Sequence, residues 1–202
     1  MAGPQGLTGF VERAPKMNNP LRILRAFDAN LHDRTEVTLF GRAALALGFS
    51  HAPSNFHLTK DVDAILPFDW LAAQDENMDF WLAQQKTNAE LSPEGLYLTH
   101  LFRESEIIIR VDWLEHRVSV PLQLARLDVY RPAVIDLVLT KMARADEQDL
   151  EDIRFLLSNE PASETALKEA FLRARVPEVN EIRQLFLAAQ AKVLELAREF
   201  SK

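Results

Sequence analysis

Residues 59–66 read T-K-D-V-D-A-I-L, and this stretch carries the strongest indication of both fold and chemistry. Polar and apolar residues alternate from Asp61 to Leu66, which is the period of a β-strand, and Pro67 ends the run. Asp61 and Asp63 are therefore predicted on one strand face, about 7 Å apart. Two carboxylates on one face are unfavourable unless they are exposed, protonated or bound to a cation. Two interpretations stay open here, a solvated acidic face and a Mg²⁺ site.

A strand followed by a helix is predicted just upstream. Residues 37–40 read V-T-L-F, Gly41 ends this strand, and the following residues begin a helix that runs to Gly48. A glycine at such a turn leaves the backbone N–H groups at the helix N-terminus free to meet a phosphate. Gly41 is equally compatible with a simple turn.

The rest of the chain divides into a mixed α/β part and a helical part. Helices are predicted over 21–31 and 75–88, β-runs over 96–102 and 107–113 with a hairpin turn at 103–106, and short edge strands over 119–122 and 127–130. After Pro132 four helices are predicted, over 133–144, 146–157, 163–175 and 178–200. The fold class is therefore α+β, a small mixed β-sheet core flanked by helices with a C-terminal helical extension. We expect an N-terminal tail (1–20), an α/β core (21–132) and a C-terminal helical region (133–202).

Composition narrows the class of protein. The chain has 202 residues, of which 48% are hydrophobic and 26% charged, the values of an ordinary globular protein. The absence of cysteine excludes disulfides, thiolate metal sites and cysteine nucleophiles. The net charge of −7 is opposite to that of most sequence-independent nucleic-acid binders. No segment resembles a signal peptide or a membrane span, so we expect a cytoplasmic protein without membrane contact.

Common catalytic motifs are missing. The sequence contains no phosphate-binding P-loop, no dinucleotide-binding glycine pattern, no zinc-protease helix motif and no serine-hydrolase elbow. The five histidines are scattered along the chain, and their spacing gives no metal-site pattern. Each is interpreted as an ordinary surface or core residue: His32, His51, His57, His100 and His116.

Three blocks in order suggest a family. They are V-T-L-F-G-R-A-A-L at 37–45, T-K-D-V-D-A at 59–64 and D-L-V-L-T-K-M-A-R-A-D-E-Q-D-L-E-D-I at 136–153, and a further carboxylate, Asp112, ends the β-run I-I-I-R-V-D-W. Over about residues 20–158 the chain resembles the nucleotidyltransferase fold of the polymerase-beta type. More narrowly, it resembles bacterial nucleotidyltransferase-like proteins related to the AbiEii toxins of abortive-infection toxin–antitoxin systems.

The resemblance implies roles for individual residues. Asp61, Asp63 and Asp112 would bind the metal ion, and Asp112, brought beside the pair by a neighbouring strand, would also orient or deprotonate the attacking hydroxyl. Gly41 and Thr59 would contact the substrate, and Lys141 would lie near the phosphates or the base.

Several assignments keep an alternative. Arg42 stands where the family has glycine or serine, so that its side chain either crowds the triphosphate or binds it. Asp149 and Asp152 would match a trailing acidic pair, although acidic residues are also favourable at a solvated helix start. Lys141 can equally offset the dipole of its helix.

The implied activity is metal-assisted transfer of a nucleotidyl group from an NTP to a hydroxyl, with Mg²⁺ (or Mn²⁺) as cofactor. The acceptor is left open between RNA, a protein side chain and a small molecule, and an antitoxin-like protein is an implied partner. The alternative is a catalytically inactive member that uses the same fold as a binding module.

Overall fold

Five strands form a mixed sheet in the order β3-β2-β1-β6-β5. The computed structural model describes residues 18–73 and 75–200. β1 pairs with β2 antiparallel and with β6 parallel, β2 pairs with β3 parallel, and β5 pairs with β6 antiparallel. A separate two-stranded ribbon joins β4 and β7 antiparallel. The strands are β1 (Thr35–Phe40), β2 (Asp61–Leu66), β3 (Tyr97–Arg103), β4 (Ile109–Arg110), β5 (Val118–Ser119), β6 (Leu127–Arg131) and β7 (Ala174–Arg175).

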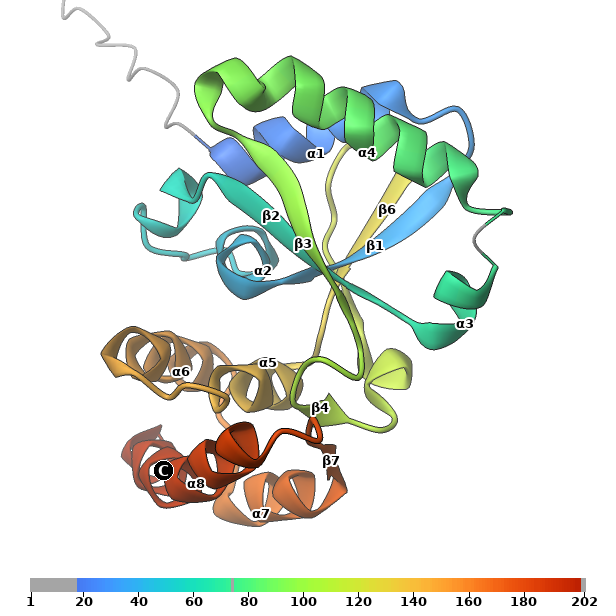
Figure 1. Cartoon of the computed structure of the whole chain (residues 1–202). Coiled ribbons are helices and arrows are strands. Elements are labelled where there is room, and N and C mark those ends of the chain that lie inside the picture. The colour runs from blue at the N-terminus through green and yellow to red at the C-terminus, as the bar shows by residue number, and fades with distance from the viewer. Residues whose placement is uncertain (1–17, 74, 201–202) are drawn as a thin grey trace, which may run out of the picture.

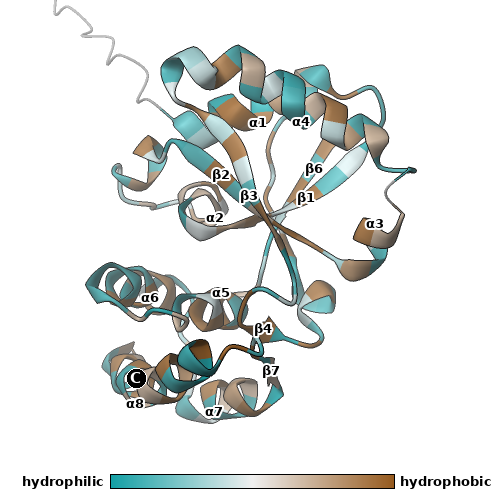
Figure 2. Ribbon diagram, viewed as in Figure 1, coloured by the Kyte–Doolittle hydropathy of each residue, from teal (hydrophilic) through white to brown (hydrophobic). Residues whose placement is uncertain are grey.

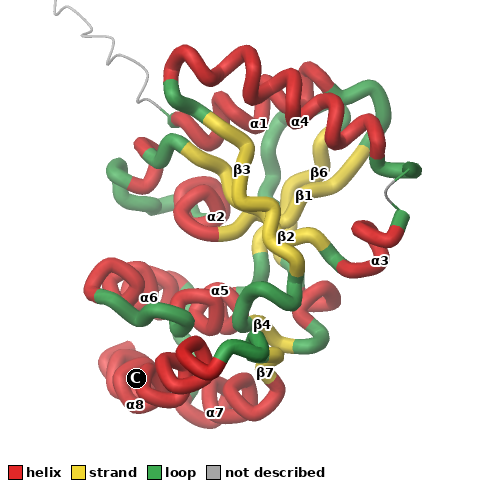
Figure 3. The backbone as a smooth tube through the Cα atoms, viewed as in Figure 1, coloured by secondary structure: helices red, strands yellow, loops and turns green. Residues whose placement is uncertain are grey.

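Helices lie on both sides of this sheet (Figure 1). α1 and α4 lie on one side, and the C-terminal helices α5 to α8 gather on the other (Figures 1 and 3). The helices are α1 (Asn19–Asn30), α2 (Gly41–Gly48), α3 (Phe68–Ala72), α4 (Met78–Leu91), α5 (Val134–Lys141), α6 (Glu147–Asn159), α7 (Glu164–Arg173) and α8 (Asn180–Phe200). Three short 3₁₀ helices are η1 (Phe56–Leu58), η2 (Ser92–Glu94) and η3 (Trp113–His116). The α+β class, the mixed sheet and the C-terminal helices are confirmed.

Local sequence explains where several helices begin. Asn18 caps α1, because its side chain accepts a 3.1 Å hydrogen bond from the Leu21 N–H. Asp146 caps α6 by accepting from the Asp149 N–H at 2.8 Å, and Ser163 caps α7 in the same way. These caps satisfy N–H groups that have no partner inside the helix, and they agree with the predicted helix starts.

The alternation along β2 gives the sheet two different faces at this strand. Val62 and Ala64 are fully buried in the main hydrophobic core, whereas Asp61 and Asp63 on the opposite face stay partly exposed. Farther along the same face, Ile65 packs into a second, smaller apolar cluster with residues such as Trp113. The strands accordingly carry both hydrophilic and hydrophobic colours along their length in Figure 2. The face that holds the carboxylates is therefore polar at one end and apolar at the other.

Some sequence-based expectations are wrong. The β-run over 107–113 contains only the two-residue strand β4, which pairs with β7, so the expected hairpin with β3 does not form. Arg110 accounts for the position of β4. Its Nε and Nη2 atoms donate to the carboxylate of the fully buried Asp136 on α5 at 2.9 and 2.7 Å, which draws β4 toward the C-terminal helices. The strand over 127–130 is not at an edge, because β6 lies between β1 and β5. Helix α3 was not expected.

Two observations bear on the ends of the chain and on membranes. Most of the expected N-terminal tail, residues 1–17, lies outside the described residues, and α1 begins at Asn19. Within the described ranges, no helix combines the length and apolar character that crossing a membrane requires.

Candidate active site

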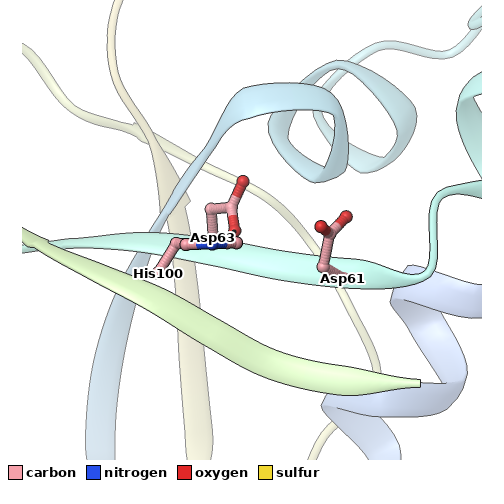
Figure 4. Close-up of side chains that lie close together, drawn as sticks. All are labelled: Asp61, Asp63 and His100. Carbon is pink, nitrogen blue, oxygen red and sulfur yellow. Dashed lines mark hydrogen bonds and ion pairs between the residues drawn. The ribbon is translucent and has the colours of Figure 1, made fainter. Parts of the chain in front are cut away.

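Asp61 and Asp63 lie on one face of β2, as the alternation predicts (Figure 4). Val62, between them, points to the opposite face and is fully buried. The Asp61 Oδ1 atom accepts a 2.6 Å hydrogen bond from the Thr59 hydroxyl, which lies in the turn before the strand. The pair is thus held in place by the strand and by Thr59.

An irregularity in β3 brings His100 to the same place. The pairing with β2 is regular up to Leu98 and resumes at Leu101, so Thr99 and His100 both stand opposite Asp63. Such a β-bulge changes the direction in which a side chain points. The φ angle of His100 is +45°, in the left-handed region that few residues other than glycine adopt. The His100 Nδ1 atom lies 3.0 Å from the Asp63 Oδ1 atom.

These three side chains form a group that could hold a metal ion. One ligand atom from each of Asp61, Asp63 and His100 lies within 4.8 Å of the other two. Two carboxylates and one imidazole are a donor set that divalent cations accept in proteins. The fit to a metal ion is supported by the side chains themselves, which converge from β2 and β3 (Figure 4).

The carboxyl group of Asp63 has an unusual environment. Burial raises the pKa of Asp63 to about 6, and the nearby charge of Asp61 acts in the same direction. The hydrogen bond with His100 and the more distant charge of Lys141 oppose this rise only in part. A cation at the cluster would favour the ionised form of Asp63 and so relieve this unfavourable charge.

Gly41 lies directly against the same carboxylate. Phe40 is opposite Asp63 in the β1–β2 ladder, and Gly41 follows it at the start of α2. Its φ angle is +58°, and an added Cβ atom would stand 3.0 Å from the Asp63 Oδ2 atom. Glycine is therefore required both by the backbone conformation and by the close approach. This turn also presents the N-terminus of α2 to the site.

Basic side chains face the acidic cluster from the C-terminal end of α5 and from the turn that follows it. The Lys141 Nζ donates to the Asp152 Oδ2 at 2.6 Å and to the Asp149 Oδ1 at 3.3 Å. Arg144 makes two hydrogen bonds of 3.1 Å to Asp149. Asp149 and Asp152 are almost completely buried. These two carboxylates fix the positions of the Lys141 and Arg144 side chains, because a buried carboxylate is stable only when it is paired.

Arg42 belongs to the same ionic network. Its Nη2 atom lies 3.6 Å from the Asp152 Oδ1 atom, and its guanidinium carbon is 5.2 Å from the centre of the Phe56 ring. The Arg42 Nε atom is buried and has no hydrogen-bond partner among the described residues. Counting formal charges, Arg42, Lys141 and Arg144 balance Asp149, Asp152 and Asp146, whose Oδ2 atom lies 3.8 Å from the Arg144 Nε atom.

The acidic and basic groups line one cleft of about 510 Å³. Asp61, Asp63 and His100 contribute from the sheet, whereas Lys141 and Arg144 contribute from the C-terminal helices. The volume lies in the range of small-molecule sites. The residues around it are Phe40, Gly41, Arg42, Thr59, Asp61, Asp63, His100, Phe102, Glu106, Ile107, Thr140, Lys141, Ala143, Arg144, Gln148 and Asp149.

Asp112 is the one predicted site residue that the structure does not bring to this cleft. It lies in the turn before η3, and its carboxylate contacts Arg173 and, at 3.3 Å, the His116 Nε2 atom. The strand beside β2 is β3 rather than the run that contains Asp112. The predicted convergence of Asp112 with the Asp61–Asp63 pair is therefore not found.

Sequence reasoning missed other residues of the cleft. His100 was interpreted as an ordinary histidine, because strand parity cannot reveal a side chain that a bulge redirects. The alternative of a solvated acidic helix start is wrong for Asp149 and Asp152, which are 1% and 0% exposed. The i, i+3 spacing of these two residues, with lysine and arginine on the preceding helix, was the available signal.

A mixed sheet flanked by helices, with an aspartate pair and a glycine turn at one cleft, is consistent with the nucleotidyltransferase fold. Residues 21–160 match the model of a family described as nucleotidyltransferases of unknown function (DUF6036), and the chain belongs to this family. No curated protein and no solved structure matches the chain significantly.

Proposed function

We propose that this protein transfers a nucleotidyl group from an NTP to a hydroxyl acceptor with the help of a divalent cation. The observation that carries the proposal is the opposition of charges across one cleft. Asp61, Asp63 and His100 form an acidic wall that suits a cation. Arg42, Lys141 and Arg144 line the same cleft and suit phosphates.

The carboxylates would hold Mg²⁺ or Mn²⁺. Asp61 and Asp63 each have one oxygen, Oδ1, in a hydrogen bond. The cationic side chains of the opposite wall are already held by Asp149 and Asp152, so they offset the charge of the Asp61–Asp63 pair only in part. A divalent ion at this place would offset negative charge on the triphosphate and on the departing pyrophosphate.

The residues of the chain would bind and orient the triphosphate. Lys141 and Arg144 offer charged donors, and the N-terminus of α2 at Gly41 offers backbone N–H groups to a phosphate oxygen. In the reaction the acceptor hydroxyl gives its proton to solvent and its oxygen forms a bond to the α-phosphorus. The bond from that phosphorus to the bridging oxygen breaks, and pyrophosphate leaves. Asp112 has no part in this proposal, because its carboxylate contacts Arg173 and His116 outside the cleft.

We further propose that residues 133–202 act as a unit that frames one wall and helps to select the acceptor, with residues 21–132 supplying the other wall. The acceptor can be RNA, a protein side chain or a small molecule. A toxin role with an antitoxin-like partner rests only on the sequence resemblance to AbiEii-related proteins.

A non-catalytic binding module is the second candidate. Two points favour it: Asp112, the expected third carboxylate, contacts Arg173 and His116 outside the cleft, and Arg42 occupies the turn position for which the family resemblance implies glycine or serine. An inactive member would still bind a nucleotide or a partner at this cleft.

Labelled nucleotides separate these candidates. The purified chain would be incubated with NTPs that carry ³²P at the α or the γ position, with and without total RNA, in Mn²⁺, Mg²⁺ or EDTA. Nucleotidyl transfer leaves the α label, but not the γ label, on RNA or on the chain itself. Asp63→Asn should abolish the transfer, and Asp69→Asn, an exposed carboxylate on α3, should not.

Binding of a non-hydrolysable NTP analogue supplies a test that needs no acceptor. Calorimetric titration should show clear binding with a divalent cation and little in EDTA, since carboxylates and triphosphate repel each other at short range. Equal affinity in both buffers would contradict the metal-dependent function. Metal-dependent binding without release of pyrophosphate from any NTP would favour the binding module.

A further inference from the structure

His100 has a position that a structural histidine in a strand does not need. His100 lies in the bulge of β3 opposite Asp63, and its side chain is 59% exposed. Burial in a core therefore does not explain the left-handed backbone, which is uncommon outside glycine even though histidine adopts it more often than most residues. The imidazole is instead directed at the carboxylate pair, where its Nδ1 atom meets the Asp63 Oδ1 atom at 3.0 Å.

The cluster otherwise has only two carboxylates. Asp112, the expected third one, contacts Arg173 and His116. Within the part of the chain that the structure describes, the group of three ligands at this place consists of Asp61, Asp63 and His100. The third protein ligand available to a cation is thus a nitrogen rather than an oxygen.

This difference affects which cation binds best. Mg²⁺ prefers oxygen ligands and dehydrates reluctantly, so a nitrogen donor adds little to its binding. Imidazole suits iron, nickel, copper and zinc best, and affinity at a mixed nitrogen and oxygen site rises along the first-row series from Mn²⁺, its weakest member. A site with one imidazole therefore discriminates against Mg²⁺ more than a site with three carboxylates does.

We propose that His100 is the third protein ligand of the metal site, in place of a carboxylate, and that it gives the site a preference for Mn²⁺ over Mg²⁺. The inference rests on the proposed function, since it names the ligand set of the same cation. It concerns the metal ion alone and requires neither nucleotide nor acceptor.

Electron paramagnetic resonance of the protein with Mn²⁺ tests the ligand directly. Pulsed measurements should detect coupling to an imidazole nitrogen in the wild-type chain, and His100→Asn should remove it. His116→Asn is the matched control, because this histidine contacts Asp112 instead. Asparagine and aspartate adopt left-handed backbone more readily than most residues, so they suit position 100.

Competition between the two metals tests the preference. Titration of the free Mn²⁺ signal with Mg²⁺ present should show that His100→Asn weakens Mn²⁺ binding about tenfold or more, the scale of losing a partner at a metal site. His100→Asp should restore binding through oxygen and narrow the preference for Mn²⁺. Thermal unfolding in EDTA would verify that each variant is folded.

The outcomes are distinguishable. Binding of Mn²⁺ to the wild type without nitrogen coupling, or unchanged affinity in His100→Asn, would overturn the role of His100 and leave the proposed function standing. If the folded wild-type chain binds neither Mn²⁺ nor Mg²⁺, the metal-dependent function fails together with this inference.

Discussion

Replacing Asp63 by asparagine should stabilise the metal-free protein while abolishing metal binding. The pKa of Asp63 rises from its ordinary value of 3.8 to about 6, mainly because of burial and then because of the charge on Asp61. At about 1.4 kcal/mol per pH unit, the charged form costs up to about 3 kcal/mol of folding free energy at pH 8. Asparagine keeps the shape and removes the charge.

The assay is urea or thermal unfolding in EDTA at pH 8. We expect Asp63→Asn to exceed the wild type by about 1–3 kcal/mol, or roughly 3–9 °C in Tm for a protein of this size. Asp69→Asn, at an exposed position, should stay within about 0.5 kcal/mol of the wild type.

The pH dependence of unfolding shows whether the charge on Asp63 destabilises the folded protein. The folded-state pKa lies above the unfolded value, so the wild type carries the full cost above pH 6 and loses it as the pH falls toward 3.8. The advantage of Asp63→Asn should shrink over that window. With Mn²⁺ at about 100 times its Kd, the wild type should gain about 2.7 kcal/mol and the variant none. A destabilised variant in EDTA at pH 8, or an advantage that persists at pH 4, would refute this reasoning.

Three further substitutions test the surroundings of the cluster. Gly41→Ala places a methyl group 3.0 Å from the Asp63 Oδ2 atom at a φ of +58°, and chemical denaturation should show a loss of about 1–2 kcal/mol; an unchanged midpoint would contradict the close approach. Lys141→Met leaves buried Asp149 and Asp152 short of a cation and should cost about 3 kcal/mol, against a change within about 0.5 kcal/mol for exposed Lys86→Met. Arg42→Ala should weaken metal-dependent NTP binding by roughly 1.5–3 kcal/mol in calorimetry, whereas tighter binding would mean that the side chain crowds the triphosphate.

Local patterns in the sequence were sufficient for much of the fold. The alternation in 61–66 predicted β2 with the bounds that are observed, and Asp146 predicted the start of α6, because both depend on residues within a few positions of each other. The partners of each strand depend on distant residues instead. The short β4 looked like half of a hairpin with β3, but Arg110 and the buried Asp136 direct it to β7.

The candidate site could also be predicted from the sequence only in part. Gly41 and the Asp61–Asp63 pair could be found from their spacing, and Thr59 and Lys141 from the family resemblance, and all five line the cleft. The third member of the metal cluster could not be found in this way. Asp112 has the expected chemistry, but it lies in the turn before η3 rather than on a strand beside β2. His100 is in the right place only because β3 contains one residue more than regular pairing requires.

That extra residue also has a consequence for how such a site can arise. Leu98 and Leu101 both pack with the main core, and Phe102 packs with the second apolar cluster, so the faces of β3 keep their order on either side of the bulge. A chain without His100 would pair Thr99 with Asp63 in an unbroken ladder, and the core residues would keep their faces. The insertion or deletion of a single codon at this point would thus add or remove a nitrogen donor while leaving the hydrophobic framework unchanged.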